Sequence, residues 1–357
     1  MMRYLKWNDD VVGTIGEDFS VAFSVPEYNE VVALYTRGSA AWTSEQFIAF
    51  LSERIISRDR RDIERILFRC GLSRYDVIRI AEITRGIHPK DMLWLAAREE
   101  EPLRDAMTSV FENIFQRNID SAGDSIDTPE GYNIKRYGVF HGRYGIYKKR
   151  LNPLATDAES EVAVYLLANE LGVSCCPAFR VDEDTVFSEF RYDFSREYLV
   201  HFRRLVNDAR SDNEYKNLLS VRPQYKDAID RMILLDFITR QDDRHLSNIA
   251  IKISGDEESF YPLYDNGRSL FYEDTSETVA KAIRNPEAYA TTFGYAGTYL
   301  DYVKEICAKR GTVSDLINLT VPRERIAEIL REAGFTDYRF DGALEWIAKT
   351  LEFLLRP

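Results

Sequence analysis

Apolar residues in the first third of the chain recur mostly every three or four positions, which is the spacing of one face of a helix. One such stretch follows Thr43 and Gln46, which stand at the spacing of a capping box. Its apolar positions are Phe47, Phe50, Leu51 and Ile55. A second stretch, over 60–70, repeats this spacing and stops at Gly71, a residue type that commonly ends helices. We therefore expect residues 1–120 to form a mostly helical segment.

The pattern changes in the next part of the chain. Residues 117–131 are rich in Asn, Asp, Ser, Gly and Pro, a composition typical of a loop or a domain boundary. Two aromatic-rich runs follow, 132–140 and 143–149, and the pair His141-Gly142 between them is short enough for a tight turn. These residues predict a β-hairpin.

A helix is predicted directly after this hairpin. Thr156 and Glu159 have the spacing of a capping box, and Gly172 is placed to end the helix. One face carries Glu161, Val164, Ala168 and Leu171. Because a carboxylate on an inward-facing stripe needs a partner, Glu161 is a candidate for an ion pair.

Two strands are expected next, around 179–181 and 186–192, and helices dominate from about Tyr225 onward. Within this last part, the polar stretch 236–248 precedes a short apolar strand over 249–251. The predicted order is hairpin, helix, strands and a helical half, which indicates an α+β fold.

The polar stretch holds residues suited to phosphoryl transfer. Asp243 and Asn248 stand five positions apart, and a second acid, Asp265, ends the run Pro-Leu-Tyr-Asp. In phosphoryl transfer, one carboxylate orients the acceptor hydroxyl or accepts its proton, while an amide and a second carboxylate hold Mg²⁺ on the phosphates. A loop between a helix and a strand can bring these three side chains to one cleft.

Composition and charge narrow the expected partners. The chain has 357 residues, with 47 Lys and Arg against 59 Asp and Glu, which gives a formal net charge of -12. A field of this sign repels phosphate backbones and anionic lipid, so we expect no direct nucleic-acid partner and no membrane partner. The chain shows no secretory signal and no apolar run near the roughly 20 residues that span a bilayer, so a cytoplasmic location is expected.

The cysteines point to no metal site. They are Cys70, Cys175, Cys176 and Cys307. They form no CxxC pair and have no histidine at ligand spacing, so we expect reduced thiols rather than a zinc site or a disulfide framework.

Around the polar stretch the chain resembles the HipA-like serine/threonine kinases, a bacterial branch of the protein-kinase-like fold close to the phosphatidylinositol kinases. The family motif D-x-H-x-x-N is met by residues 243–248, which read Asp-Arg-His-Leu-Ser-Asn. The metal-binding aspartate of the family is met by Asp265 in its apolar-Tyr-Asp context. The resemblance covers roughly residues 131–270 and extends more loosely to both ends.

The resemblance implies a role for each of these side chains. Asp243 would be the catalytic base or orienting group, and Asn248 and Asp265 would be the Mg²⁺ ligands. His245 would buttress the catalytic loop through hydrogen bonds, as a satisfied buried histidine. Asp242 is the rival for the base, and we prefer Asp243 because the motif counts back from His245 and Asn248.

A kinase-like site also needs a lysine that clamps the nucleotide phosphates and pairs with a helix glutamate. Glu161 is the candidate for the glutamate, and either Lys148 or Lys149 for the lysine. We favour Lys148, because Ile146, two positions before it, suits the wall of an adenine pocket better than Tyr147 does.

The resemblance further implies how the rest of ATP is held. Adenine would lie against residues 186–190, with the backbone of Glu189 and Phe190 forming the hinge. The phosphate-covering loop of the family corresponds to 121–131, which has no glycine-rich pattern and is followed by Lys135. Its hydroxyl residues are candidate phosphoacceptors, with a flexible linker as the alternative: Ser121, Ser125 and Thr128.

We therefore expect an α+β, bilobal protein-kinase-like fold. A mostly helical N-terminal extension would cover 1–120, a small β-rich N-lobe 121–195 and a helical C-lobe 196–357. The expected function is ATP- and Mg²⁺-dependent phosphorylation of Ser or Thr on a protein. Because many members of the family are toxins, the resemblance implies a small antitoxin partner and a translation component as substrate, with a stand-alone signalling kinase as the alternative.

Two further functions stay open from the residues alone. The same fold could phosphorylate a small molecule or a lipid, although the chain has no polybasic tract that would favour an anionic membrane. It could also bind a nucleotide without catalysis. That alternative is disfavoured because a module that transfers no phosphate has no need of a base.

Overall fold

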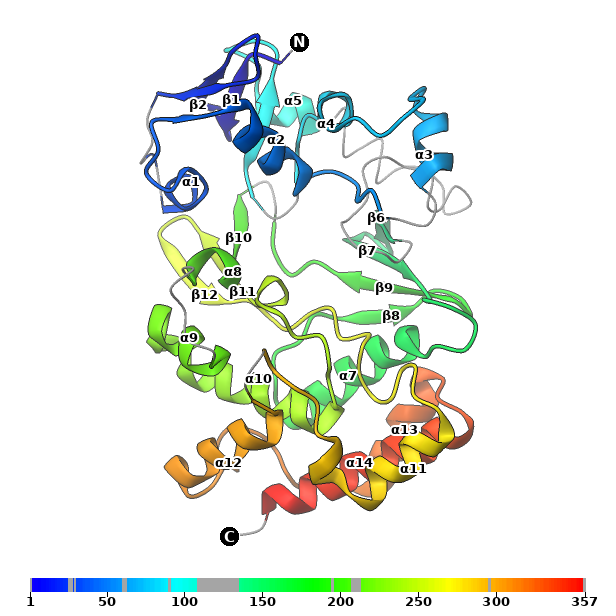
Figure 1. The fold of residues 1–357 in the computed structure, drawn as a ribbon. Helices are drawn as coiled ribbons and strands as arrows, with labels where there is room; N and C mark the ends of the chain where they lie inside the picture. The colour runs from blue at the N-terminus through cyan, green and yellow to red at the C-terminus, as the bar shows by residue number, and fades with distance from the viewer. Residues whose placement is uncertain are drawn as a thin grey trace. The chain divides into compact units, whose positions relative to one another are not determined.

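The computed structural model describes residues 2–24, 28, 30–59, 63–88, 91–107, 135–193, 196–206, 213–294 and 297–355. The chain forms two compact units (Figure 1). The first unit comprises Met1–Lys149, Tyr192–Val200 and Lys252–Glu258. The second unit comprises Arg150–Arg191, His201–Ile251 and Ser259–Pro357. The division into 1–120, 121–195 and 196–357 stays a prediction.

The first unit contains a sheet that the apolar pattern did not predict. Its strands are β1 (Tyr4–Trp7), β2 (Asp10–Ile15), β3 (Val21–Phe23), β4 (Ala41–Trp42) and β5 (Leu93–Ala96). They pair antiparallel in the order β4-β3-β2-β1-β5. The description of residues 1–120 as mostly helical is therefore incomplete. The strands are two to six residues long, so they leave little periodicity to detect.

The helices in the described part of the first unit are α1 (Glu30–Thr36), α2 (Ser44–Ser52), α3 (Ile63–Arg69), α4 (Val77–Thr84) and α5 (Leu103–Met107). Two of them, α2 and α3, lie in the stretches predicted to be helical, and the three others were not individually predicted. The capping box is confirmed, since the backbone N–H of Thr43 donates to Gln46 Oε1 at 2.9 Å and the N–H of Gln46 donates to Thr43 Oγ1 at 3.3 Å. Gly71, beyond the end of α3, is left-handed with a φ of 74°.

The predicted hairpin is confirmed as β6 (Lys135–Phe140) and β7 (Arg143–Lys149). Its two turn residues have positive φ angles, 48° for His141 and 76° for Gly142, as the tight turn between right-twisted strands requires. A separate three-stranded sheet has the order β10-β11-β12. Its strands are β10 (Glu197–His201), β11 (Ala250–Ser254) and β12 (Glu257–Phe260).

The second unit is mainly helical. Its long helices are α7 (Asp157–Leu171), α10 (Lys226–Thr239), α12 (Tyr299–Arg310), α13 (Arg323–Ala333) and α14 (Asp337–Leu355). The shorter helices are α8 (Phe202–Leu205), α9 (Glu214–Val221), η3 (Pro223–Tyr225), η4 (Leu246–Asn248), α11 (Ser276–Arg284) and η5 (Pro286–Tyr289). A hairpin of β8 (Ala178–Arg180) and β9 (Thr185–Glu189) follows α7, as predicted. The α+β class is confirmed.

Two helices are apolar or buried on nearly all sides. In α10 every residue from Met232 to Thr239 is buried, and α12 and α14 pack against it. In α7 burial extends to the acidic residues of its first turn, and the helix ends at Gly172 with a φ of 72°. A helix buried all round lies in the centre of a unit, so both can hold functional groups rigidly.

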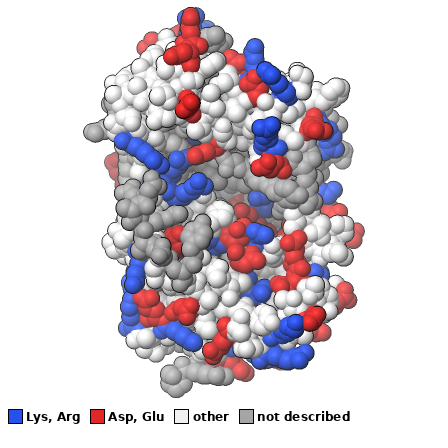
Figure 2. Space-filling view, viewed as in Figure 1, with Lys and Arg blue, Asp and Glu red and all other residues white. Residues whose placement is uncertain are grey.

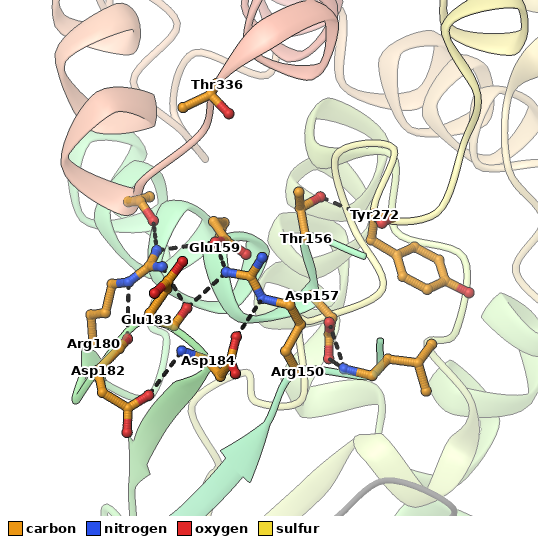
Figure 3. A network of polar contacts seen from close by, with 12 residues as sticks. Arg150, Thr156, Asp157, Glu159, Arg180, Asp182, Glu183, Asp184, Tyr272 and Thr336 are labelled. Carbon is orange, nitrogen blue, oxygen red and sulfur yellow. Dashed lines mark hydrogen bonds and ion pairs between the residues drawn. The ribbon is translucent and has the colours of Figure 1, made fainter. Parts of the chain in front are cut away.

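The capping box predicted at the start of α7 is wrong. The Thr156 side chain makes no hydrogen bond to the helix, and its hydroxyl instead lies 3.5 Å from the carbonyl oxygen of Tyr272. The Glu159 carboxylate is bound by two guanidinium groups, those of Arg150 and Arg180 (Figure 3). Contacts from distant parts of the chain therefore replace the local cap.

The charged surface, the cysteines and the longest helices can be compared with what the composition suggested. Figure 2 shows acidic and basic side chains interspersed over the visible face. The four cysteines are free thiols. Among the described residues, no helix is long and apolar enough to cross a membrane.

Candidate active site

Asp243 and Asn248 lie in the loop between α10 and β11. Helix α10 ends at Arg240, whose φ of 53° turns the chain out of the helix. The loop then makes one turn of 3₁₀ helix, η4, which ends at Asn248 and leads directly into β11. The motif is therefore held between a buried helix and a strand.

The buried amide of Gln241 fixes the start of this loop. Its Oε1 accepts hydrogen bonds from the backbone N–H groups of Asp242, at 2.9 Å, and Asp243, at 3.0 Å. Its Nε2 donates to the backbone carbonyl of Asp265 at 3.4 Å. Gln241 thus ties the candidate bases to the turn that carries the candidate metal ligand.

Arg244 makes a second tie between the same two segments. Its guanidinium forms a bidentate ion pair with Asp236 of α10, at 3.0 and 2.9 Å, and both side chains are buried. It also donates to the carbonyl of Tyr264 and to Asn266 Oδ1, each at 2.6 Å. Burial opposes the charge of Arg244, but the Asp236 carboxylate raises the pKa of the guanidinium above its ordinary value.

The candidate metal ligands fit a hard cation. Asn248 Nδ2 donates to the carbonyl of Asp243 at 3.1 Å, so Oδ1 remains as the ligand atom. Asp265 has a φ of 57°, and the hydroxyl of the preceding Tyr264 donates to the carbonyl of Ser247 at 2.8 Å. One amide oxygen and one carboxylate, completed by phosphate oxygens and water, form the kind of oxygen set that Mg²⁺ prefers. Among the described residues, no cluster of three His, Cys, Asp or Glu forms a separate metal site.

Asp242 and Asp243 share one cationic neighbour. Arg268 lies 3.9 Å from Asp242 Oδ1 and 3.5 Å from Asp243 Oδ1. Partial burial raises the pKa of the Asp242 carboxyl to about 6, while the positive charge of Arg268 acts in the opposite direction. The two carboxylates are about equally exposed, so the preference for Asp243 as base stays a prediction.

His245 is not the buried side chain that was expected. It is exposed, and its Nδ1 accepts a hydrogen bond of 3.2 Å from the backbone N–H of Ser247. This contact caps η4 locally. His245 stabilises the loop through its own segment, while the buried support comes from Gln241 and Arg244.

Residues 266–272 run along the first turns of α7, the helix that carries Glu161. The Ser160 hydroxyl donates to the carbonyl of Ser269 at 2.8 Å, and the N–H of Thr156 donates to the carbonyl of Tyr272 at 2.9 Å. Glu161 itself is buried. The segment that follows Asp265 is therefore attached to the helix of the candidate glutamate.

A polar network holds this end of α7 to the β8–β9 turn (Figure 3). Arg180 donates to Glu159 Oε1 at 3.1 Å and to the carbonyl of Ala333 at 2.9 Å. Arg150 and Arg180 both donate to the carbonyl of Glu183. Helix α7 is thus fixed by neighbours on several sides.

The candidate lysines lie on β6 and β7 in the first unit. Lys135 stands directly opposite Lys148 in the hairpin register, so these two side chains share one face. Lys148 is buried, whereas Lys149 is exposed and points to the other face. The pairing of Lys148 with Glu161, which belongs to the second unit, stays a prediction.

The remaining predicted positions are tested only in part. Glu189 ends β9, its N–H donates to the carbonyl of Pro177 at 2.9 Å, and both it and Phe190 are half-buried. Their role as hinge stays a prediction. The candidate phosphoacceptors Ser121, Ser125 and Thr128 lie outside the described residues.

Sequence reasoning missed three side chains of this site: Gln241, Arg244 and Arg268. Arg244 stood inside the quoted motif, and Asp236 is eight residues before it, but neither position revealed the buried pair. Gln241 and Arg268 carry no sequence signal, because their contacts to the site are to the backbone or to side chains more than twenty residues away.

Comparisons with known proteins give a structural match. No family model and no curated protein sequence matches the chain. HipA in the toxin–antitoxin complex of HipA, HipB and operator DNA from Shewanella oneidensis MR-1 is similar, with a TM-score of 0.54 and 12% identity over 99% of this chain and 97% of that chain. The proinflammatory kinase CtkA of Helicobacter pylori gives a TM-score of 0.49 and 17% identity over 62% of this chain and 87% of that chain. The expected resemblance is confirmed at the level of the fold: the chain has a HipA-like kinase fold.

Proposed function

We propose that this chain is an ATP- and Mg²⁺-dependent kinase that phosphorylates Ser or Thr on a protein. One observation carries the proposal: two buried side chains, Gln241 and Arg244, join the loop of Asp243 and Asn248 to the turn of Asp265. Phosphoryl transfer needs these three groups in one place, and catalysis there is mostly positioning and charge stabilisation. The HipA-like fold supports the same reading.

Each residue has a task in this mechanism. Asp243 orients the acceptor hydroxyl and takes its proton as the bond to phosphorus forms. Asn248 Oδ1 and Asp265 would hold Mg²⁺, which neutralises charge on the phosphates when it is bound. Lys148 clamps the phosphates, with Lys135 beside it.

The test compares two neighbouring carboxylates. The purified protein is incubated with labelled ATP, Mg²⁺ and a cell lysate, and protein-bound label is measured for wild type, Asp243→Asn and Asp242→Asn. We expect Asp243→Asn to lose about 100-fold or more of the rate and Asp242→Asn to retain most of it. The opposite ranking would make Asp242 the base. Equal labelling by all three proteins would refute the kinase proposal.

The chemistry of the acceptor is tested in the same reaction. Acid hydrolysis of the labelled proteins should release phosphoserine or phosphothreonine. Label found only in metabolites or lipid would instead favour a small-molecule or lipid kinase. ATP binding without transfer to any acceptor would favour a nucleotide-binding module.

We also propose a small protein partner and a cytoplasmic location. The HipA structure was solved with HipB and operator DNA, which supports an antitoxin-like partner for this fold. The expectation that no nucleic acid is contacted directly gains no support from that complex. If the chain is a toxin, its expression in a bacterium should arrest growth, and Asp265→Ala should abolish the arrest. Arrest that survives this substitution would exclude kinase-dependent toxicity.

A further inference from the structure

Arg268 is the cation nearest to the candidate bases in the described part of the second unit. It stands three residues after Asp265, and its side chain is half exposed. Its Nη1 lies 3.5 Å from Asp243 Oδ1, and its Nε lies 3.9 Å from Asp242 Oδ1. Neither distance is short enough for a good hydrogen bond.

The rest of Arg268 is firmly held. Its carbonyl accepts a hydrogen bond of 3.1 Å from the N–H of Asp242, which fixes its backbone against the catalytic loop. Its Nε donates to the Tyr272 hydroxyl at 2.8 Å, and the guanidinium lies over the same ring, 5.2 Å from its centroid. Tyr272 is in turn attached to Thr156, and Figure 3 shows its ring extending away from that residue.

The terminal nitrogens of Arg268 can still donate hydrogen bonds to a ligand. Over the described residues, Nη1 and Nη2 make no hydrogen bond, although an arginine carries two N–H donors on each. Arg244 shows how an arginine binds a carboxylate that it serves to neutralise. Its guanidinium is fully buried and contacts Asp236 in a bidentate pair at 3.0 and 2.9 Å. A cation placed only to neutralise Asp243 would be expected to bind it as closely.

We propose that Arg268 is a further catalytic residue, whose terminal N–H groups bind the oxygens of the phosphoryl group during transfer. This inference rests on the proposed kinase function. As the acceptor oxygen bonds to phosphorus and the bond from phosphorus to the ADP oxygen breaks, the hydroxyl proton passes to Asp243. Negative charge is spread over the phosphoryl oxygens, and a fixed guanidinium beside Asp243 stabilises that charge without changing its own protonation.

The test uses Arg268→Gln and Arg268→Lys in the full chain. The control is Arg323→Gln on α13, since Arg323 is also half exposed and ion-paired, at 2.6 Å to Glu345. Arg268→Gln should lower kcat by about 100-fold or more, with the Kd for ATP changed less than about threefold. Affinity for ADP with Mg²⁺ and aluminium fluoride, which mimics the phosphoryl group in transfer, should fall by a similar factor as kcat. Arg268→Lys should retain an intermediate rate, because it keeps the charge but loses the planar fork.

The outcomes separate this inference from the proposed function. A wild-type protein that transfers no phosphate would refute both. An active wild type with Arg268→Gln within threefold of its kcat would refute only the role of Arg268. A lower kcat with unchanged aluminium fluoride affinity would also refute it, since the effect would then come from the placement of Asp243. If Arg268→Gln is unfolded at the assay temperature, the test rests on Arg268→Lys. A wild-type kcat and a wild-type affinity for ADP with aluminium fluoride in Arg268→Lys would then refute the role of Arg268.

Discussion

Glu161 packs against Gly267, the second residue after Asp265. A Cβ atom at position 267 would lie 3.5 Å from Glu161 Cγ and 3.2 Å from the carbonyl oxygen of Asp157. The first of these contacts is ordinary, but the second is tighter than most Cβ atoms tolerate. The absence of a side chain at Gly267 therefore lets the turn of the candidate metal ligand lie directly on the helix of the candidate glutamate.

This close contact predicts a graded response to substitution. Gly267→Ala should push the turn from α7 and lower the phosphotransfer rate by about tenfold, and Gly267→Val, which is larger and β-branched, should lower it further. The measurement is kcat together with the free energy of unfolding in urea. Gly142→Ala is the control, since nothing lies within 4 Å of a Cβ there and only the hairpin turn is strained. Equal rates for Gly267→Val and wild type would show that this contact is unimportant.

The buried pair of Arg244 and Asp236 predicts a large asymmetry between single and double variants. Among the described residues, Arg244→Leu leaves the buried Asp236 carboxylate with only the Tyr299 hydroxyl, 3.2 Å away, and it should destabilise the chain by about 3–5 kcal/mol. Removing both charges, with Asp236→Leu added, should recover part of that loss. Urea unfolding gives both values.

The control for that pair is Arg325→Gln. Its ion pairs with Glu170, at 2.7 Å, and Glu328, at 3.1 Å, are partly exposed, so their loss should destabilise the chain far less than the loss of the buried pair. If Arg244→Leu were no more destabilising than this control, the buried ion pair would not be a main support of the loop between α10 and β11.

Asp157 predicts a pH dependence of stability. Burial raises the pKa of its carboxyl to about 6, with the charges of Glu161 and Glu159 adding to the effect and hydrogen bonds from Leu151 opposing it. This pKa lies above the unfolded-state value of about 3.9. The contribution of the protonated carboxyl to stability is therefore complete below about pH 3.9 and is lost as the pH rises through about 6.

Asp157→Asn removes this titration. The free energy of unfolding of Asp157→Asn minus that of wild type should therefore increase by roughly 1–3 kcal/mol as the pH rises from about 4 to about 7.5. Urea unfolding at several pH values measures it. A relative stability that stays constant over this range would contradict the raised pKa.

Sequence patterns predicted the elements whose stabilising partners are close in the chain. The capping box of Thr43 and Gln46 formed because its two residues are three positions apart. The capping box at Thr156 did not form, because Glu159 is bound by Arg180, twenty-one residues later. The sheet of the first unit was not predicted because its strands are only two to six residues long, and because one of its pairings, that of Leu5 with Leu95, joins distant parts of the chain.

The same distinction holds for the site. Motif spacing selected Asp243, Asn248 and Asp265 as candidates, because their order along the chain matches the order that the family resemblance implies. Motif spacing could not predict the backbone conformation of the segment that carries Asp265. Asp265, Leu270 and Phe271 all have left-handed φ angles although none is glycine, so the segment is held by tertiary contacts rather than by its own preference.

Lys148 and Lys149 offer a test of the phosphate clamp in which each residue is the control for the other. Lys148 is buried and shares a face of the hairpin with Lys135, whereas Lys149 is exposed on the opposite face. Both substitutions to Met remove one charge of the same kind, so any difference between them comes from position. We expect Lys148→Met to abolish measurable phosphotransfer and Lys149→Met to stay within about threefold of wild type, because only a lysine on the binding face can reach the phosphates. Titration with an ATP analogue should show the same ranking. If Lys149→Met were the inactive variant, the clamp would lie on the other face and the adenine wall would be Tyr147 rather than Ile146.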